Sequence, residues 1–331
     1  MATSDRGDLQ LAADGRPQRD AIVLADNLEV LPQIADGSFQ LIYLDPPFNT
    51  GRSQTRRTLA TAPDADGDRT GFQGRRYSTR LLAQSRYRDS FDDYLGFLEP
   101  RLREASRLLT LSGTLYFHID YREAHYCKLL LDEIFGRECF LNEIIWAYDY
   151  GARSRRRWPA KHDTILVYVR DPDAYHFDAA AVDREPYMAP GLVTAEKAAR
   201  GKLPTDVWWH TIVPTNGREK TGYPTQKPQG ILRRMVQAST QPGDWCLDCF
   251  AGSGTLGAVA AALGRRYLLI DSNPEAIEVM RARLATPPAP RSAATGGRPR
   301  DAPAATVPPA AGTTSSNDPA ARPGRAAAAR G

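Results

Sequence analysis

Leu247-Asp-Cys-Phe-Ala-Gly-Ser-Gly-Thr-Leu-Gly257 is the stretch of sequence that decides the fold. An apolar run ends at Asp248, and the glycines from Gly252 onward form a GxGxxG turn that opens a helical pattern. Glycines at this spacing let a nucleotide approach the backbone, and an acid ending the next strand can hold a ribose hydroxyl. Asp271 stands at that position, so the sequence predicts a nucleotide-binding β-α-β unit.

This unit lies late in the chain. Residues 286–331 follow its last helix and consist mostly of Ala, Pro, Gly, Arg, Ser and Thr. Such a composition buries too little apolar surface to offset its ordering entropy, so we expect a disordered tail there, and a disordered N-terminus at residues 1–19. The other strands of the sheet must then precede the unit, which predicts one domain over residues 20–285.

Composition narrows the class of protein. The chain is 42% apolar and 25% charged, as in soluble globular proteins, and it has no apolar run of the roughly 18 to 20 residues that a membrane helix needs. Four cysteines are too few for a disulfide scaffold, which favours the cytoplasm. Cys246 and Cys249 form a CxxC pair without a second pair at ligand spacing, so we expect no metal site.

The tail, with six Arg and two Asp, accounts for the whole net charge of +4, so the rest of the chain is neutral overall. Within that neutral part, basic residues still gather in two places. Residues 52–88 contain nine Arg against three Asp and interrupt the alternation of strands and helices, as an insert would. The second cluster lies in a loop between two predicted strands, where it could bind the phosphates of a nucleic acid, the alternative being a solvated loop. Its residues are Arg153, Arg155, Arg156, Arg157 and Lys161.

A second motif, Asp45-Pro46-Pro47-Phe48, follows a buried apolar run and so lies where open α/β sheets bind ligands. Two prolines fix φ and hold the neighbouring carbonyls in a rigid arc. The Asp45 carboxylate and the Pro46 carbonyl can then accept both hydrogens of an exocyclic amine and turn its lone pair toward an electrophile. Phe48 offers a flat face to a base that has left the stack.

In this order the motifs resemble those of the β-order (permuted) S-adenosylmethionine-dependent DNA amino-methyltransferases. Residues 41–51 are similar to the catalytic motif of that family, 223–228 to the motif that leads into the cofactor half, and 247–255 to the cofactor loop. The resemblance covers most of residues 21–284. It implies an α/β fold with a single doubly wound, mostly parallel Rossmann-like sheet, a circularly permuted motif order, and a small target-recognition insert at 171–222.

The resemblance also implies roles for single residues. The residues implied to engage the target base are Asp45, Pro46, Pro47 and Phe48. The residues implied to bind S-adenosylmethionine are Asp26, Thr225, Lys227, Asp248, Phe250, Gly252, Ser253, Gly254 and Asp271. Among these, Thr225 and Lys227 would meet the methionine carboxylate. Because Asp is the more usual first residue of the Pro-Pro motif in the N6-adenine enzymes of the family, adenine in double-stranded DNA is the expected target.

Other functions stay open at this point. Cytosine N4 is the alternative target, an NAD-dependent oxidoreductase could use the GxGxxG turn, and a DNA-binding subunit could keep the fold without turnover. The family resemblance further suggests a homodimer, a restriction endonuclease as partner, and a cytoplasmic location on the nucleoid. No membrane contact is expected.

Overall fold

The computed structural model describes residues 9–49, 91–151, 153–214 and 216–285, and the strands at 54–63, 69–70 and 76–87. The predicted disorder of residues 1–8 and 286–331 concerns segments that lie outside the described residues. Among the helices that are described, none is long and apolar enough to cross a membrane.

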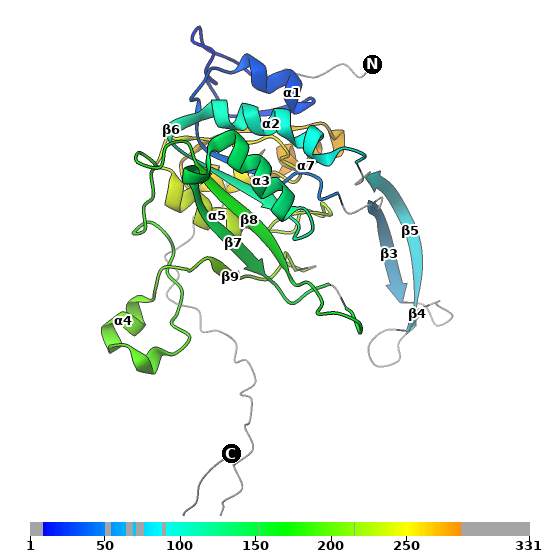
Figure 1. Ribbon diagram of the computed structural model, residues 1–331. Coiled ribbons are helices and arrows are strands. Elements are labelled where there is room, and N and C mark those ends of the chain that lie inside the picture. The colour runs from blue at the N-terminus through cyan, green and yellow to red at the C-terminus, as the bar shows by residue number, and fades with distance from the viewer. Residues whose placement is uncertain are drawn as a thin grey trace, which may run out of the picture. The chain divides into compact units, whose positions relative to one another are not determined.

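Eight strands form one mixed sheet in the order β1-β11-β10-β2-β6-β8-β7-β9 (Figure 1). Neighbours from β1 to β6 pair in parallel, β8 runs antiparallel to β6 and to β7, and β9 is parallel to β7. The predicted mostly parallel α/β sheet is therefore confirmed. The strands are β1 (Ala21–Leu24), β2 (Phe39–Leu44), β6 (Leu109–Ile119), β7 (Phe140–Ala147), β8 (His162–Val169), β9 (Val207–Trp209), β10 (Trp245–Asp248) and β11 (Arg266–Asp271).

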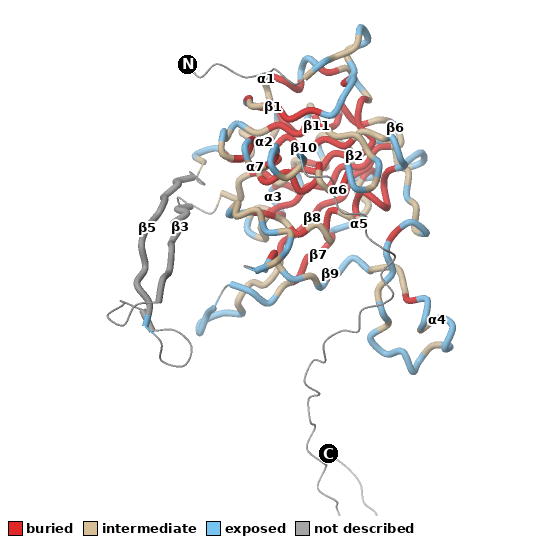
Figure 2. The backbone as a smooth tube through the Cα atoms, turned by 180° about the vertical axis from the view of Figure 1, so that it is seen from behind, coloured by how far each residue is buried: buried red, intermediate tan, exposed pale blue. Residues whose placement is uncertain are grey.

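Helices cover both faces of this sheet, which makes it doubly wound. All six residues of β2 are buried. Ile42 and Leu44 pack in one core cluster with residues of α2 and α3, whereas Leu41 and Tyr43 pack in another with residues of α5 and α6. Buried residues accordingly follow the central strands (Figure 2). The helices are α1 (Asn27–Val30), α2 (Tyr94–Leu108), α3 (Ala124–Phe135), α4 (Ala195–Arg200), α5 (Gln229–Ser239), α6 (Thr255–Ala262) and α7 (Pro274–Ala285).

The pairing of β10 with β2 joins two parts of the chain that lie far apart in sequence. The strands are parallel, with Asp248 opposite Tyr43. Because the carboxyl ends of parallel strands meet at one edge, the Asp45 motif and the glycine turn emerge on the same rim. The fold thus brings together the two motifs on which the predicted function depends.

Residues 9–19 differ from the prediction of disorder. Leu11 and Pro17 form an isolated β-bridge, and Leu11 packs against the core. The Arg16 guanidinium donates a hydrogen bond of 2.9 Å to the Gly37 carbonyl. The prediction was wrong for this part of the N-terminus because its apolar and backbone groups find partners in the domain.

The basic segment at 52–88 contains strands of its own. β3 (Gln54–Pro63), β4 (Arg69–Thr70) and β5 (Arg76–Tyr87) form a separate antiparallel sheet in the order β3-β5-β4. These strands do not pair with the main sheet. It stays a prediction that this segment is an insert relative to the family. The same holds for the role of residues 171–222 in recognising the target.

Candidate functional site

A cavity of about 510 Å³ opens at the rim where β1, β2, β10 and β11 end. The lining includes every residue that was predicted to be catalytic or to bind the cofactor, except Gly254. Gly254 belongs to the same glycine turn as Gly252 and Ser253, which do line the cavity. Five acidic and two basic side chains are among the lining residues. This excess of carboxylates favours a ligand that carries positive charge.

The glycine turn is held by the carboxylate of Asp271. One oxygen accepts the N–H of Gly252 at 2.7 Å, and the other accepts the N–H of Asn273 at 2.8 Å. Gly254 has φ +69°, and a Cβ at this position would lie 2.7 Å from Met280 Cγ. Both the backbone conformation and the close packing therefore require glycine there.

Asp248 is a buried carboxyl behind the turn, 3% exposed, whose Oδ1 accepts the Phe250 N–H at 3.0 Å. Burial raises its pKa well above the ordinary value, and the nearby carboxylates of Asp45 and Asp271 raise it further. Burial also raises the pKa of Asp271, against the opposing effect of its backbone hydrogen bonds. A cation bound in the cavity would lower the pKa of both acids and stabilise their ionised forms.

Asp45 forms an ion pair with Lys227 in the lining of the cavity. Lys227 Nζ lies 2.7 Å from Asp45 Oδ1 and 2.5 Å from Oδ2, and the two side chains are 12% and 14% exposed. The same ammonium lies 4.8 Å from the centroid of the Phe48 ring. Lys227 thus contacts the motif predicted to be catalytic, and its contact with a methionine carboxylate stays a prediction.

Neighbouring groups brace the Asp45 motif from behind. Tyr94 donates a 2.6 Å hydrogen bond to the Pro47 carbonyl. Asn49 has a positive φ of 51°, donates to Glu123 at 3.0 Å and accepts the Phe91 N–H at 3.1 Å. Together with the two prolines, these contacts hold the motif in one conformation.

A buried polar network that the sequence did not predict lies behind Phe48. His118 is fully buried, with Nδ1 2.8 Å from the Tyr43 hydroxyl and Nε2 3.2 Å from Asp163 Oδ2. The Tyr148 hydroxyl donates to the other Asp163 oxygen at 3.0 Å. Burial opposes ionisation of Asp163, but the hydrogen bond and charge of His118 outweigh it and lower the pKa. His118 has polar partners on both ring nitrogens, as expected of a structural histidine.

Asp26 also lines the cavity, but its oxygens already have partners. Arg101 Nη2 lies 3.2 and 3.3 Å from them, and the Leu28 N–H donates to Oδ1 at 2.9 Å. Arg101 Nε donates to Asn27, whose Nδ2 donates to the Cys249 carbonyl. This chain of contacts ties the end of β1 to α2 and β10. Sequence reasoning missed the contacts of Arg101 and Asn27 because their partners lie far away along the chain.

Arg283 of α7 is another residue that only the structure reveals. Its Nη1 donates to the Ser253 carbonyl at 3.1 Å and to Thr255 Oγ1 at 3.0 Å. The side chain therefore fixes the glycine turn from behind. Thr225, predicted to meet the cofactor, is exposed on the cavity wall.

The predicted DNA-binding residues lie in the loop between β7 and β8. All four arginines from Arg153 to Arg157 are exposed. Lys161 differs, because its Nζ donates a 2.7 Å hydrogen bond to the Asp149 carbonyl and so closes the base of the loop. The arginines are free to meet phosphates, while Lys161 shapes the loop.

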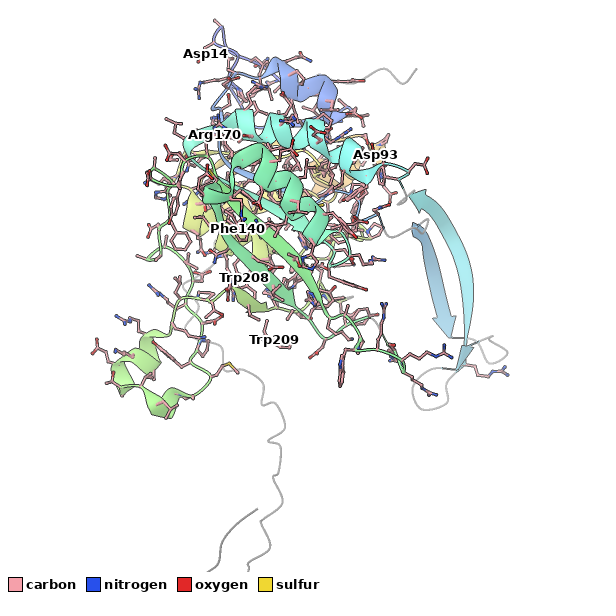
Figure 3. The ribbon with its side chains drawn as sticks, viewed as in Figure 1. Asp14, Asp93, Phe140, Arg170, Trp208 and Trp209 are labelled. Carbon is pink, nitrogen blue, oxygen red and sulfur yellow. The ribbon has the colours of Figure 1, made fainter. Side chains whose placement is uncertain are left out.

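Two adjacent tryptophans of β9 lie in different surroundings (Figure 3). Trp208 is 7% exposed and donates to the Thr205 carbonyl, whereas Trp209 is 68% exposed. Core packing therefore accounts for Trp208.

A doubly wound sheet with a glycine turn and the Asp-Pro-Pro-Phe motif on one rim is the architecture of an α/β enzyme that binds its ligands at the carboxyl ends of the strands. The family model of the N6/N4 methyltransferases, described as DNA methylase, matches residues 39–282. The chain belongs to this family.

Two curated relatives are similar over most of the chain. The DNA adenine methyltransferase YhdJ of Escherichia coli (strain K12) is 30% identical over 271 residues, which is 80% of this chain and 82% of that protein. The type II methyltransferase M.HpaI of Haemophilus parainfluenzae is 29% identical over 265 residues, or 80% and 73%.

Solved structures show the same fold. The cytosine-N4-specific PvuII DNA methyltransferase matches 82% of this chain and 88% of its own, with 14% identity and a TM-score of 0.54. The complex of M1.HpyAVI with SAM matches 80% and 98%, with 20% identity and a TM-score of 0.51. At these identities the likeness concerns the fold alone.

Proposed function

We propose that this DNA methylase transfers a methyl group from S-adenosylmethionine to the N6 amine of an adenine flipped out of duplex DNA. The observation that carries the proposal is that the Asp45 motif and the glycine turn line one cavity. A relative named as an adenine methyltransferase, at 30% identity, supports adenine over cytosine.

The residues of the cavity fit this cofactor. Its carboxylates suit a sulfonium cation, Asp271 reaches the turn where a ribose would lie, and Phe250 offers an apolar wall. Thr225 and Lys227 supply a hydroxyl and an ammonium for a carboxylate. When bound, S-adenosylmethionine supplies an electrophilic methyl group.

The protein's own contribution is to orient the amine. Asp45 and the Pro46 carbonyl accept its two hydrogens, which directs the nitrogen lone pair into the cavity. Lys227 balances the charge of Asp45 and holds it in place. The nitrogen loses one proton as its new bond to carbon forms, and Asp45 is the adjacent base that can take it.

DNA would be held by the exposed arginines of the loop between β7 and β8, and read by residues 171–222. Phosphate contacts position the duplex, whereas side chains reaching base edges select the sequence. Through the family we further propose a location on the nucleoid, a homodimer, and a restriction endonuclease with the same target sequence as partner.

The test is expression in a host that lacks DNA methylation, followed by nucleoside mass spectrometry and methylome sequencing. N6-methyladenine at one sequence is the expected result. N4-methylcytosine alone would overturn the choice of base, and unmodified DNA would overturn the proposed activity. Calorimetry with S-adenosylhomocysteine and NAD separates a methyltransferase from an oxidoreductase, since the proposal expects binding of the former alone.

A further inference from the structure

Trp158 is the most exposed large apolar side chain in the described part of the chain, at 94%. A single exposed apolar side chain needs no explanation by itself, so the chemical surroundings of Trp158 decide what it could bind. Trp158 follows directly on Arg155, Arg156 and Arg157, which are exposed as well. The loop therefore presents an indole beside a row of guanidinium groups.

Hydrogen bonds within the loop hold the described residues on both sides of Trp158. The Ser154 hydroxyl accepts the N–H groups of Arg156 and Arg157, both at 3.2 Å. At its base, the Tyr148 N–H donates to the Lys161 carbonyl at 2.9 Å, and the Lys161 ammonium binds a carbonyl across the loop. These bonds hold the tip in a defined turn, so less order has to be gained on binding.

The position of the loop connects it to the proposed active site. It leaves the main sheet at the carboxyl end of β7, and β7 points in the same direction as β2, so the loop emerges on the rim that carries Asp45. Figure 1 shows it projecting beyond the sheet. Tyr148, at the base of the loop, binds Asp163, which binds His118 behind Phe48. DNA on this rim would meet both the loop and the cavity.

We propose that Trp158 inserts into the duplex and stacks in the space that the flipped base leaves, while the arginines bind the flanking phosphates. The inference rests on the proposed function. Extruding a base costs its stacking and pairing, and an apolar wedge between base steps recovers part of that stacking. An indole is the largest flat side chain available for this purpose.

The surroundings of Trp158 favour nucleic acid over a protein partner. An apolar protein surface that covered the indole would also remove water from three adjacent guanidinium groups, at a cost unless each found a carboxylate. A duplex offers a phosphate to each arginine and a stack of aromatic faces to the indole. A second copy of this chain at the loop is thus an outcome of the test and not the proposal.

The test compares single-turnover methylation of two duplexes that contain the target sequence found by methylome sequencing. In one the target base is paired, and in the other it faces an abasic site, which lowers the cost of flipping. Trp158→Ala should slow methylation of the paired duplex about 10- to 100-fold, and that of the abasic duplex by about threefold or less. Trp158→Phe, which keeps a flat ring, should lie between Trp158→Ala and the wild type.

Leu111→Ala is the matched control. Leu111 is a large apolar residue that is 68% exposed. It lies near the amino end of β6, on the rim of the sheet opposite the cavity. This variant should methylate both duplexes at the wild-type rate.

Each other outcome has a separate meaning. A wild-type protein that modifies neither duplex would overturn the proposed function itself. A wild type that is active on both, with Trp158→Ala equal to it, would overturn the wedge alone. An equal loss on both duplexes would mean that Trp158 contributes only to general DNA binding, and a change of oligomeric state in light scattering would place it in a contact between protein copies.

Discussion

The two halves of the cavity rim are built in different ways. On the side proposed for the cofactor, Asp271 and Asp248 accept backbone N–H groups, and Asn27 donates to a backbone carbonyl, so main-chain groups determine the shape. On the side proposed for the target base, bonds to the Pro47 carbonyl and from the Phe91 N–H hold the motif, but Asp45 itself is held by a side-chain ion pair with Lys227, and the β7–β8 loop is exposed. Main-chain groups present a fixed surface to a ligand, whereas an ion pair between two side chains can be opened by a substrate that offers either partner a new contact.

Asp45→Ala should have the largest effect and tests whether the target side carries the chemistry. Methyl transfer should fall by about 10³-fold, because the amine loses an acceptor that acts at the reacting nitrogen. The affinity for S-adenosylhomocysteine, measured by calorimetry, should change little. Turnover equal to the wild type would remove Asp45 from the mechanism.

Lys227→Ala probes the residue that joins the two halves. Removing one partner of a largely buried ion pair leaves the other charge uncompensated, so we expect a loss of about 3 kcal/mol in the free energy of unfolding. A double-mutant cycle with Asp45→Ala, followed by calorimetry, separates the two roles of Lys227. If Lys227 meets only Asp45, the affinity for S-adenosylhomocysteine will not depend on it. A loss of affinity that persists in the Asp45→Ala background would instead support contact with the cofactor.

Arg156→Ala combined with Arg157→Ala tests the exposed loop. DNA affinity should fall about tenfold at moderate salt, and the slope of log K against log salt should decrease by about 1.8, as the loss of two phosphate contacts predicts. Cofactor affinity should stay at the wild-type value. An unchanged slope in fluorescence anisotropy titrations would show that these arginines face solvent in the complex.

Asp248→Asn should have the smallest effect, which depends on pH. The pKa of Asp248 is raised in the folded protein, so the folded state holds this proton more tightly than the unfolded chain, whose value is about 3.9. Wild-type stability is therefore lost as pH rises from about 4 through the folded pKa. The amide can still accept the Phe250 N–H without a buried charge, so the variant should be more stable than the wild type above that range.

Thermal unfolding across pH checks this prediction in the protein without ligand. The gap between Asp248→Asn and the wild type should widen with pH and close near pH 4. If the difference in stability between Asp248→Asn and the wild type did not depend on pH, ionisation of Asp248 would not be what limits the stability of the wild type.

Local sequence predicted much of the site because its parts are local. A buried apolar run that ends in Asp45-Pro-Pro, and a strand that ends in a glycine turn, each form from neighbouring residues. The same reasoning could not find the partners of Arg101, His118 and Arg283, because these partners are distant in sequence. It was also wrong for residues 9–19, whose partners, such as Gly37, lie beyond their own segment.

The sequence by itself determined the class of fold, the family and the two motifs, since periodicity, turn chemistry and motif order are properties of short stretches. Only the tertiary structure decided that Lys227 meets Asp45, that Lys161 closes its loop, and that Trp158 faces solvent. These outcomes depend on which strands become neighbours and which side chains are left over once the sheet is packed. Strand order is set by the burial of the whole domain, and no single segment contains it.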